Sequence, residues 1–328
     1  MTQISVSKNV SRSVSEAVVV AFIGAIAFTA HTTGIALLLF PELAALSHDV
    51  ITRPRGKWAS QPLRLILTPT ITAVIGLYFT RHLSYGALSV AFIVALSLMV
   101  IKLMKSTIAP AISAGALPMV LSERSWLYPL AIFGGLTLLV LILLMWRQYG
   151  TRDDHPTLSE TEHSNLVDAL EALPHDRLWT VTLMAFVLGL GVAAQLTHLR
   201  FILFPPLIVM AYELFGHPEV PGWMKRPALF PAVCLLTATI GLIAERTIHP
   251  SFVAAMVTVL CSVVVLHLFD VHMPPALAVG LLPFVMDAPD YRFVLSVLLG
   301  TASLTLYYLC YKRIRQAKRT NRFEAVNL

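Results

Sequence analysis

Long apolar stretches without a charged residue recur along this chain, and several of them run for about 20 residues. A helix of that length spans the hydrocarbon core of a lipid bilayer. Charged residues are 13% of the chain and its mean hydropathy is +0.75, too few charges to cover a soluble surface. The sequence therefore predicts an all-α, polytopic membrane bundle, and it excludes a soluble enzyme, a nucleic-acid-binding protein and a disulfide-stapled secreted domain.

Matching residues recur at a nearly constant spacing, which indicates two repeated halves. Phe40 and Pro41 recur as Phe204 and Pro205. Three glycines recur at a spacing that is longer by a single position: Gly76, Gly115 and Gly135 match Gly241, Gly280 and Gly300. We expect four parts: a first membrane repeat (1–147), a polar cytoplasmic linker (148–177), a second membrane repeat (178–311) and a basic cytoplasmic tail (312–328).

Each half offers about six apolar segments, and some are only about 15 residues long, shorter than the bilayer core is thick. We expect these short segments to be re-entrant or half-span helices, shielded from lipid by the rest of the protein. An even number of segments makes the two halves parallel, related by a pseudo-two-fold axis along the membrane normal.

The distribution of basic residues predicts the orientation. With the N-terminus inside, 19 of the 24 lysines and arginines fall on the inner side, as the positive-inside rule requires. We therefore expect both termini in the cytoplasm, and a bacterial inner membrane or its equivalent as the location. The lipid bilayer and a small anion are the expected partners, and the sequence leaves a homo-oligomer open.

The first candidate site is a polar break early in each half. It is His31-Thr32-Thr33-Gly34 in the first half and Gln195-Leu196-Thr197-His198 in the second. A helix that starts after such a break presents free N–H groups and a positive dipole end to an anion, and the threonine hydroxyls add donors. The alternative is a capped loop at the outer surface.

Arg200 follows the second of these breaks and has apolar residues on both sides. An arginine inside a membrane usually marks a ligand pathway or a carboxylate partner, and its planar fork suits a small oxyanion such as nitrite. The alternative is an arginine near the interface whose side chain extends outward to water. Its counterpart in the first half is Ala36, so a site at Arg200 would be asymmetric.

The second candidate site is Thr107-Ile108-Ala109-Pro110 and its counterpart His272-Met273-Pro274-Pro275. Proline is well tolerated at the first position of a helix, so short helices are expected to begin there, with Thr107 and His272 at or just before their first turns. Asp270 and His272 form a candidate proton-linked pair, because histidine titrates near physiological pH. The alternative is a polar loop at the inner surface.

Other chemistry is not indicated. The histidines outside the two breaks show no i, i+4 pairing, the three cysteines lie far apart in apolar runs, and no phosphate-binding glycine loop or nucleophile turn occurs. We therefore expect neither a metal nor a cofactor. Glu42 and Glu213 are interpreted as ordinary carboxylates at the membrane interface.

The run from Gly34 to Pro41, with the later motifs His272-Met273-Pro274-Pro275-Ala276 and Leu281-Leu282-Pro283, resembles the HPP family of integral membrane proteins. That family is named for a His-Pro-Pro motif, which is degenerate here and lacks its histidine in the first half. The likeness covers residues 34–147 and 199–311 as a tandem duplication.

Members of the HPP family are associated with nitrite transport. The resemblance therefore implies His272, Pro274 and Pro275 as site residues, and nitrite as the solute. A transporter or channel for a small anion is the first hypothesis for function. The alternatives are a membrane-embedded enzyme that acts on a lipid or a small redox molecule, and a structural or regulatory membrane protein without transport activity.

Overall fold

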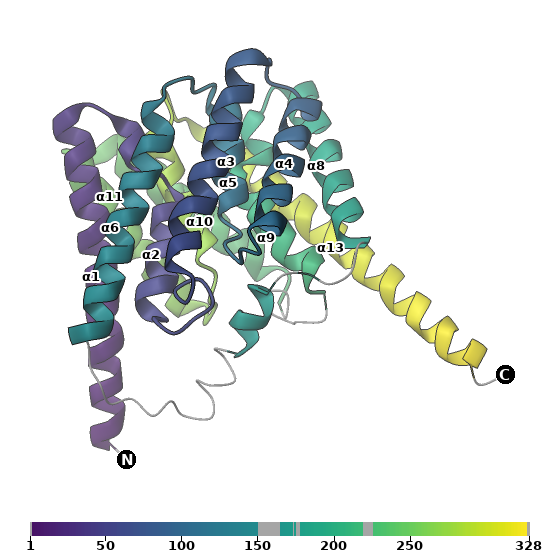
Figure 1. The fold of residues 1–328 in the computed structure, drawn as a ribbon, viewed down its shortest axis with the longest axis horizontal. Helices are drawn as coiled ribbons and strands as arrows, with labels where there is room; N and C mark the ends of the chain where they lie inside the picture. Colours follow the sequence, from purple (N-terminus) through teal and green to yellow (C-terminus); the bar gives the residue numbers. More distant parts are fainter. Residues whose placement is uncertain (1, 150–164, 173, 175–177, 219–225, 327–328) are drawn as a thin grey trace.

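Helices follow one another along the chain in this computed structural model, which describes residues 2–149, 165–172, 174, 178–218 and 226–326 (Figure 1). Within these residues no β-strand occurs, and seven helices are long and apolar enough to cross a bilayer. These are α1 (Thr2–Thr33), α3 (Pro62–His82), α6 (Leu127–Tyr149), α8 (Leu178–Thr197), α10 (Leu229–Thr247), α11 (Ser251–Leu268) and α13 (Tyr291–Val326). The predicted polytopic helical bundle is confirmed.

Short helices fill the interior of the bundle. They are α2 (Glu42–Thr52), α5 (Ala111–Leu121), α9 (Pro205–Gly216) and α12 (Pro275–Leu281), whereas α4 (Ala87–Leu103) is of intermediate length. Nearly every residue of the four short helices is buried. An 11-residue helix is about 16 Å long, so these helices are half-span pieces that the surrounding protein shields from lipid.

The two halves repeat the same order of elements. α1, α2, α3, α4, α5 and α6 correspond to α8, α9, α10, α11, α12 and α13, and the 3-10 helices η1 (Ala36–Leu38) and η2 (Arg200–Leu203) occupy equivalent places. The turns that end the helices recur as well. Gly34 and His198 have positive φ angles of 70° and 57°, and Lys105 and Asp270 have 48° and 50°. A residue in this left-handed region ends an α-helix.

Duplicated glycines set the closest helix contacts. Gly76 of α3 lies against Gly115 of α5, and Gly241 of α10 lies against Gly280 of α12. A Cβ atom on Gly76 or Gly241 would overlap the carbonyl oxygen of the opposing glycine. Backbones approach this closely only where no side chain intervenes, which is a common way to pack membrane helices.

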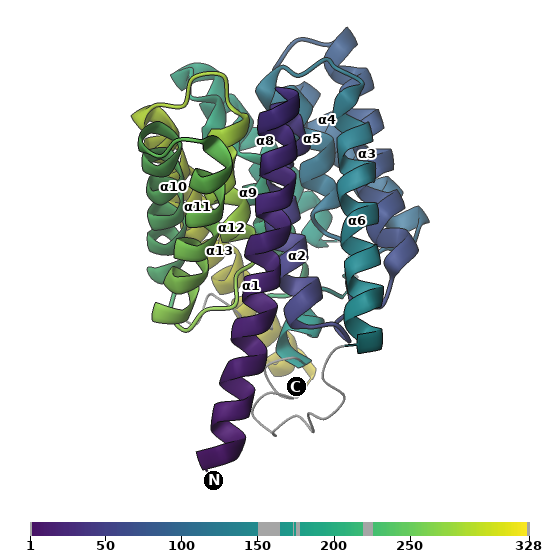
Figure 2. The same cartoon turned by 90° about the vertical axis from the view of Figure 1, so that its left-hand side faces the viewer.

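The repeats meet along a surface that we call the seam. α1 packs against α11 and α4 packs against α8, while in the interior α2 contacts α12 and α5 contacts α9 (Figure 2). Each of these contacts has its equivalent in the other half, as expected for parallel repeats. On the outside, large apolar side chains such as Leu63, Leu88 and Leu196 are more than 70% exposed, as a lipid-facing surface requires.

Both termini of the chain lie toward the same end of the bundle (Figure 1). We call it the linker end, because residues 53–61, 104–110 and 165–172 lie there, and we call the opposite end the far end. Residues 165–170 form a short helix. The rest of the predicted linker, residues 150–164, 173 and 175–177, and residues 327–328 of the tail lie outside the described residues, and the predicted part boundaries stay predictions.

Candidate functional site

Helix α2 carries acidic and basic side chains although it lies in the interior. Every residue from Glu42 to Ile51 is buried. Glu42, Asp49 and Arg53 are spaced by seven and four residues, so they lie along one side of the helix axis. Pro41 precedes the first turn, and Arg53 follows the last residue of the helix at the linker end.

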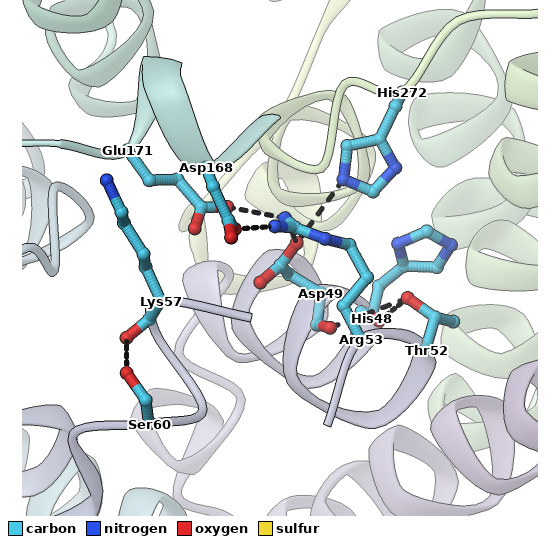
Figure 3. A network of polar contacts seen from close by, with 9 residues as sticks. All are labelled: His48, Asp49, Thr52, Arg53, Lys57, Ser60, Asp168, Glu171 and His272. Carbon is cyan, nitrogen blue, oxygen red and sulfur yellow. Dashed lines mark hydrogen bonds and ion pairs between the residues drawn. The ribbon is translucent and has the colours of Figure 1, made fainter. Parts of the chain in front are cut away.

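Arg53 is the centre of a network of ion pairs (Figure 3). Its Nη1 donates to Asp49 Oδ1 at 2.7 Å and to Glu171 Oε1 at 2.8 Å, and its Nη2 pairs with Asp168. His272 Nε2 lies 3.3 Å from Asp49 Oδ1. The network, named here the Arg53 network, therefore joins α2, the linker and the residues that precede α12, across the seam.

Negative groups outnumber positive ones in this region. Burial acts to lower the pKa of Arg53, but the carboxylates of Asp49, Glu171 and Asp168 outweigh burial and raise that pKa above its ordinary value, so the guanidinium is charged. Glu213 of α9 is also buried and interacts electrostatically with Asp49. Three carboxyl groups therefore contact one guanidinium or His272 among the described residues, and Glu213 adds a fourth nearby.

Several polar atoms at the linker end have no hydrogen-bond partner among the described residues. The donors are Arg53 Nε, Trp58 Nε1 and the Thr107 hydroxyl, and the acceptors are Asp49 Oδ2 and Glu171 Oε2. A buried polar atom without a partner costs about 1–3 kcal/mol. Such atoms at one end of the seam indicate a place where water or a small polar solute completes the hydrogen bonding.

The residues of the second break lie at the linker end, with His272 in the Arg53 network. Pro110 and Pro274 precede α5 and α12 directly, as predicted. A helix start can present free N–H groups, but here Ile112 N donates to Ala109 O and Leu277 N donates to Pro274 O, both at 3.0 Å. Because these backbone N–H groups are engaged in tight turns at the two helix starts, an anion bound at the linker end would need hydrogen-bond donors from side chains.

His272 contacts a carboxylate other than the one that the sequence suggests, and its pairing with Asp270 stays a prediction. Asp270 lies on an exposed turn where its left-handed backbone ends α11. A carboxylate that His272 faces within hydrogen-bond distance is that of Asp49, in the other repeat. Proximity in sequence suggests Asp270, whereas the pseudo-two-fold packing of α12 on α2 brings Asp49 to the imidazole.

The residues of the first break are exposed at the far end. The hydroxyls of Thr32, Thr33 and Thr197 donate to carbonyl oxygens one turn earlier in their own helices. His31 and His198 are exposed beside them.

Arg200 is exposed too, as the outward-extending alternative requires. It donates to Ser122 Oγ at 2.8 Å, and its guanidinium lies 4.8 Å from the centre of the Tyr85 ring.

The two breaks are not neighbours in space. Gln195 accepts a hydrogen bond from Ala87 N at the start of α4, and the 17 residues of α4 then lead to Lys105 at the other end. A helix of that length spans about 25 Å. The structure therefore brings together His272 and the Arg53 network, and it does not bring the first-break residues to them.

Sequence reasoning missed the acidic and basic residues of α2 and the role of the linker. Glu42 and Glu213, interpreted as interface carboxylates, are only 2% and 4% exposed. The predicted linker is more than a connector, because Glu171 is buried against Arg53. One signal was available, because Asp49 and Arg53 stand four residues apart at the end of an apolar segment, a spacing that places opposite charges together on a helix.

Comparison with known proteins gives one match. Residues 171–321 match the family model described as HPP, transmembrane region. The second repeat is therefore similar to the transmembrane region of HPP proteins. No curated protein and no solved structure matches the chain.

The HPP region runs from Glu171 through the second repeat into α13, so it contains Glu213 and His272. The predicted resemblance is confirmed for these residues, and for the first repeat it stays a prediction. Asp49 and Arg53 lie before the matched residues. The Arg53 network is thus assembled from both the matched region and the first repeat of an integral membrane protein.

Proposed function

We propose that this protein is a membrane transporter or channel for a small anion, with nitrite as the first candidate because the family resemblance implies it. The solute would cross along the seam, between the interior helices of the two repeats. The observation that carries the proposal is Arg53, which is only 11% exposed and whose guanidinium holds carboxylates from the linker at one end of the seam.

The ligands of Arg53 indicate the kind of solute. Asp168 and Glu171 present oxyanions to the guanidinium fork, and carboxylate and nitrite share two oxygens that carry one negative charge. When the short helix of the linker (residues 165–170, here called the linker helix) moves away from Arg53, the guanidinium fork becomes available to a small oxyanion from solution. The unpartnered Nε–H of Arg53 and the nearby His272 add further donors.

The same contacts close the linker end in the conformation seen. Glu171 is buried against Arg53, and His217, at the end of α9, lies 2.8 Å through its Nε2 from the carbonyl oxygen of Ala172. The linker helix thus rests on the ends of both α2 and α9. Opening this end requires the linker to exchange its ion pairs for contacts with water or with the solute.

The orientation in the membrane is part of the proposal. Most basic residues of the first repeat, including Arg55, Lys57 and Arg147, belong to the linker end. The positive-inside rule places such an end in the cytoplasm, with a bacterial inner membrane or its equivalent as the location. The linker would then control access from the cytoplasmic side.

Uptake by reconstituted vesicles tests the proposal. Purified protein in liposomes is supplied with nitrite outside, and nitrite in the lumen is measured over time against protein-free liposomes. We expect protein-dependent uptake that acetate and other small oxyanions reduce. Uptake no faster than in protein-free vesicles would contradict the proposal, and loss of total nitrite with appearance of a product would indicate the membrane-enzyme alternative.

A further inference from the structure

Glu42 is a second buried carboxyl group, separate from the Arg53 network. It lies in the first turn of α2, two helical turns before Asp49, and it is 2% exposed. The hydroxyl of Ser113, on α5, forms a hydrogen bond with Glu42 Oε1. Glu42 Oε2 is buried and has no hydrogen-bond partner among the described residues.

No base in the described part of the chain neutralises this carboxyl group. Among those residues, no lysine, arginine or histidine lies within ion-pair distance of Glu42. α2 packs against α1, α6 and α12, and Ser113 adds α5. Neither α5 nor α12 contains a titratable residue. Among the side chains that the structure describes on the other elements, the titratable groups are Tyr128 and Arg147 of α6 and Glu16 and His31 of α1. Tyr128 and Arg147 donate to the carbonyl oxygens of Ala114 and Pro54, and Glu16 pairs with His267.

The second repeat shows that the fold does not need the carboxyl group. When the repeats are aligned on their shared Phe-Pro pair, the position equivalent to Glu42 is Pro206. When they are aligned on Gly115 and Gly280, the position equivalent to Ser113 is Ala278. α9 and α12 form with these apolar residues in place of the polar pair. Packing alone therefore does not account for Glu42 and Ser113.

We propose that Glu42, held by Ser113, is a proton-binding site in the interior of the first repeat. An ionised carboxylate without a counter-charge is strongly disfavoured in such surroundings, so the neutral acid is the resting form. Binding forms the O–H bond at Oε2, with the proton taken from hydronium that reverts to water, and release reverses this step.

The position of the site suggests its use, which rests on the proposed transport function. Asp49 follows Glu42 on the same side of α2, about 10 Å along the helix axis, and Asp49 contacts His272 and Arg53. A proton bound to Glu42 and an anion bound to Arg53 would therefore lie at the two ends of α2. If the proton and the anion cross the membrane together, transport of the anion depends on the proton gradient.

Infrared spectroscopy tests proton binding without any assumption about transport. Protein in lipid is titrated with acid and base, and the carbonyl stretch of protonated carboxyl groups is compared between the wild type, Glu42→Gln and the control Asp270→Asn, which changes an exposed carboxyl group. We expect a protonated-carboxyl band at pH 7 that Glu42→Gln removes and Asp270→Asn retains. Ser113→Ala should shift its frequency, because the hydrogen bond is lost, and it provides the test if Glu42→Gln does not fold. A band that neither Glu42→Gln nor Ser113→Ala changes would overturn the proposal.

Nitrite uptake under an imposed pH gradient tests the coupling separately. The wild type is expected to take up nitrite about tenfold faster with an acidic exterior than without a gradient, and Glu42→Gln is expected to lose this acceleration. An acceleration that Glu42→Gln retains would overturn the coupling role. If the wild type takes up no nitrite, the proposed function fails, while the infrared result still decides the proton site.

Discussion

The two repeats share their backbone but differ in their polar side chains. The glycine contacts, the left-handed helix ends and the short buried helices occur twice, at equivalent positions. Asp49 and Glu213 are buried carboxyl groups at equivalent positions, but other polar groups do not follow the repeat. Equivalent pairs differ as follows: Glu42 and Pro206, Arg53 and His217, Ser113 and Ala278, His272 and Thr107. The duplicated features build the fold, and the unduplicated ones indicate where its chemistry lies.

Structural equivalence predicts that matched glycine substitutions have similar, large effects. Gly76→Ala and Gly241→Ala each force a Cβ atom into the carbonyl oxygen of the glycine opposite, so each should destabilise the protein by about 3 kcal/mol or more. The loss of stability is measured by heating the protein in detergent and determining the remaining folded fraction by size-exclusion chromatography. Gly134→Ala is the control, because its Cβ would meet no atom within 4 Å. An equal loss of stability in all three variants would show that the glycine contacts are not what holds the two repeats in the same backbone arrangement.

Releasing the linker should have an intermediate effect. Glu171→Gln removes an ion pair with Arg53 across the linker end. Weakening the closed conformation by about 1 kcal/mol raises the open population about fivefold, so nitrite uptake should rise by about that factor. Asp287→Asn, an exposed carboxyl group at the far end, is the matched control. Uptake that Glu171→Gln lowers would show that the linker supports transport and does not close the pathway.

Arg200 should matter least, although it is the most conspicuous residue in the sequence. Its side chain is exposed and bonds Ser122 and the Tyr85 ring, contacts worth at most about 1 kcal/mol at such a site. Arg200→Ala should therefore change nitrite uptake by less than about twofold. A loss of more than about tenfold would show that the first break takes part in transport.

The membrane class, the repeat and the short interior helices were predictable because apolar length, glycine spacing and proline positions act locally. The way in which the site residues come together in space was not predictable from the sequence. His272 faces Asp49 across 223 residues of sequence, and only the packing of α12 on α2 creates that contact. Arg200 and Arg53 both follow apolar segments in the sequence, and burial, which depends on how the helices pack, distinguishes them. The linker carboxylates showed no pattern that pointed to Arg53.

The most direct test of the account compares Arg53→Ala with His217→Ala, at equivalent positions in the two repeats, in nitrite uptake by vesicles that hold equal amounts of folded protein. Arg53→Lys is included because it keeps the charge without the fork, and it should retain part of the activity. We predict at least a tenfold loss for Arg53→Ala and less than a threefold change for His217→Ala, since losing the partly buried guanidinium leaves its carboxylates without that counter-charge. Equal losses in the two variants, or normal uptake by Arg53→Ala, would contradict an anion pathway at Arg53.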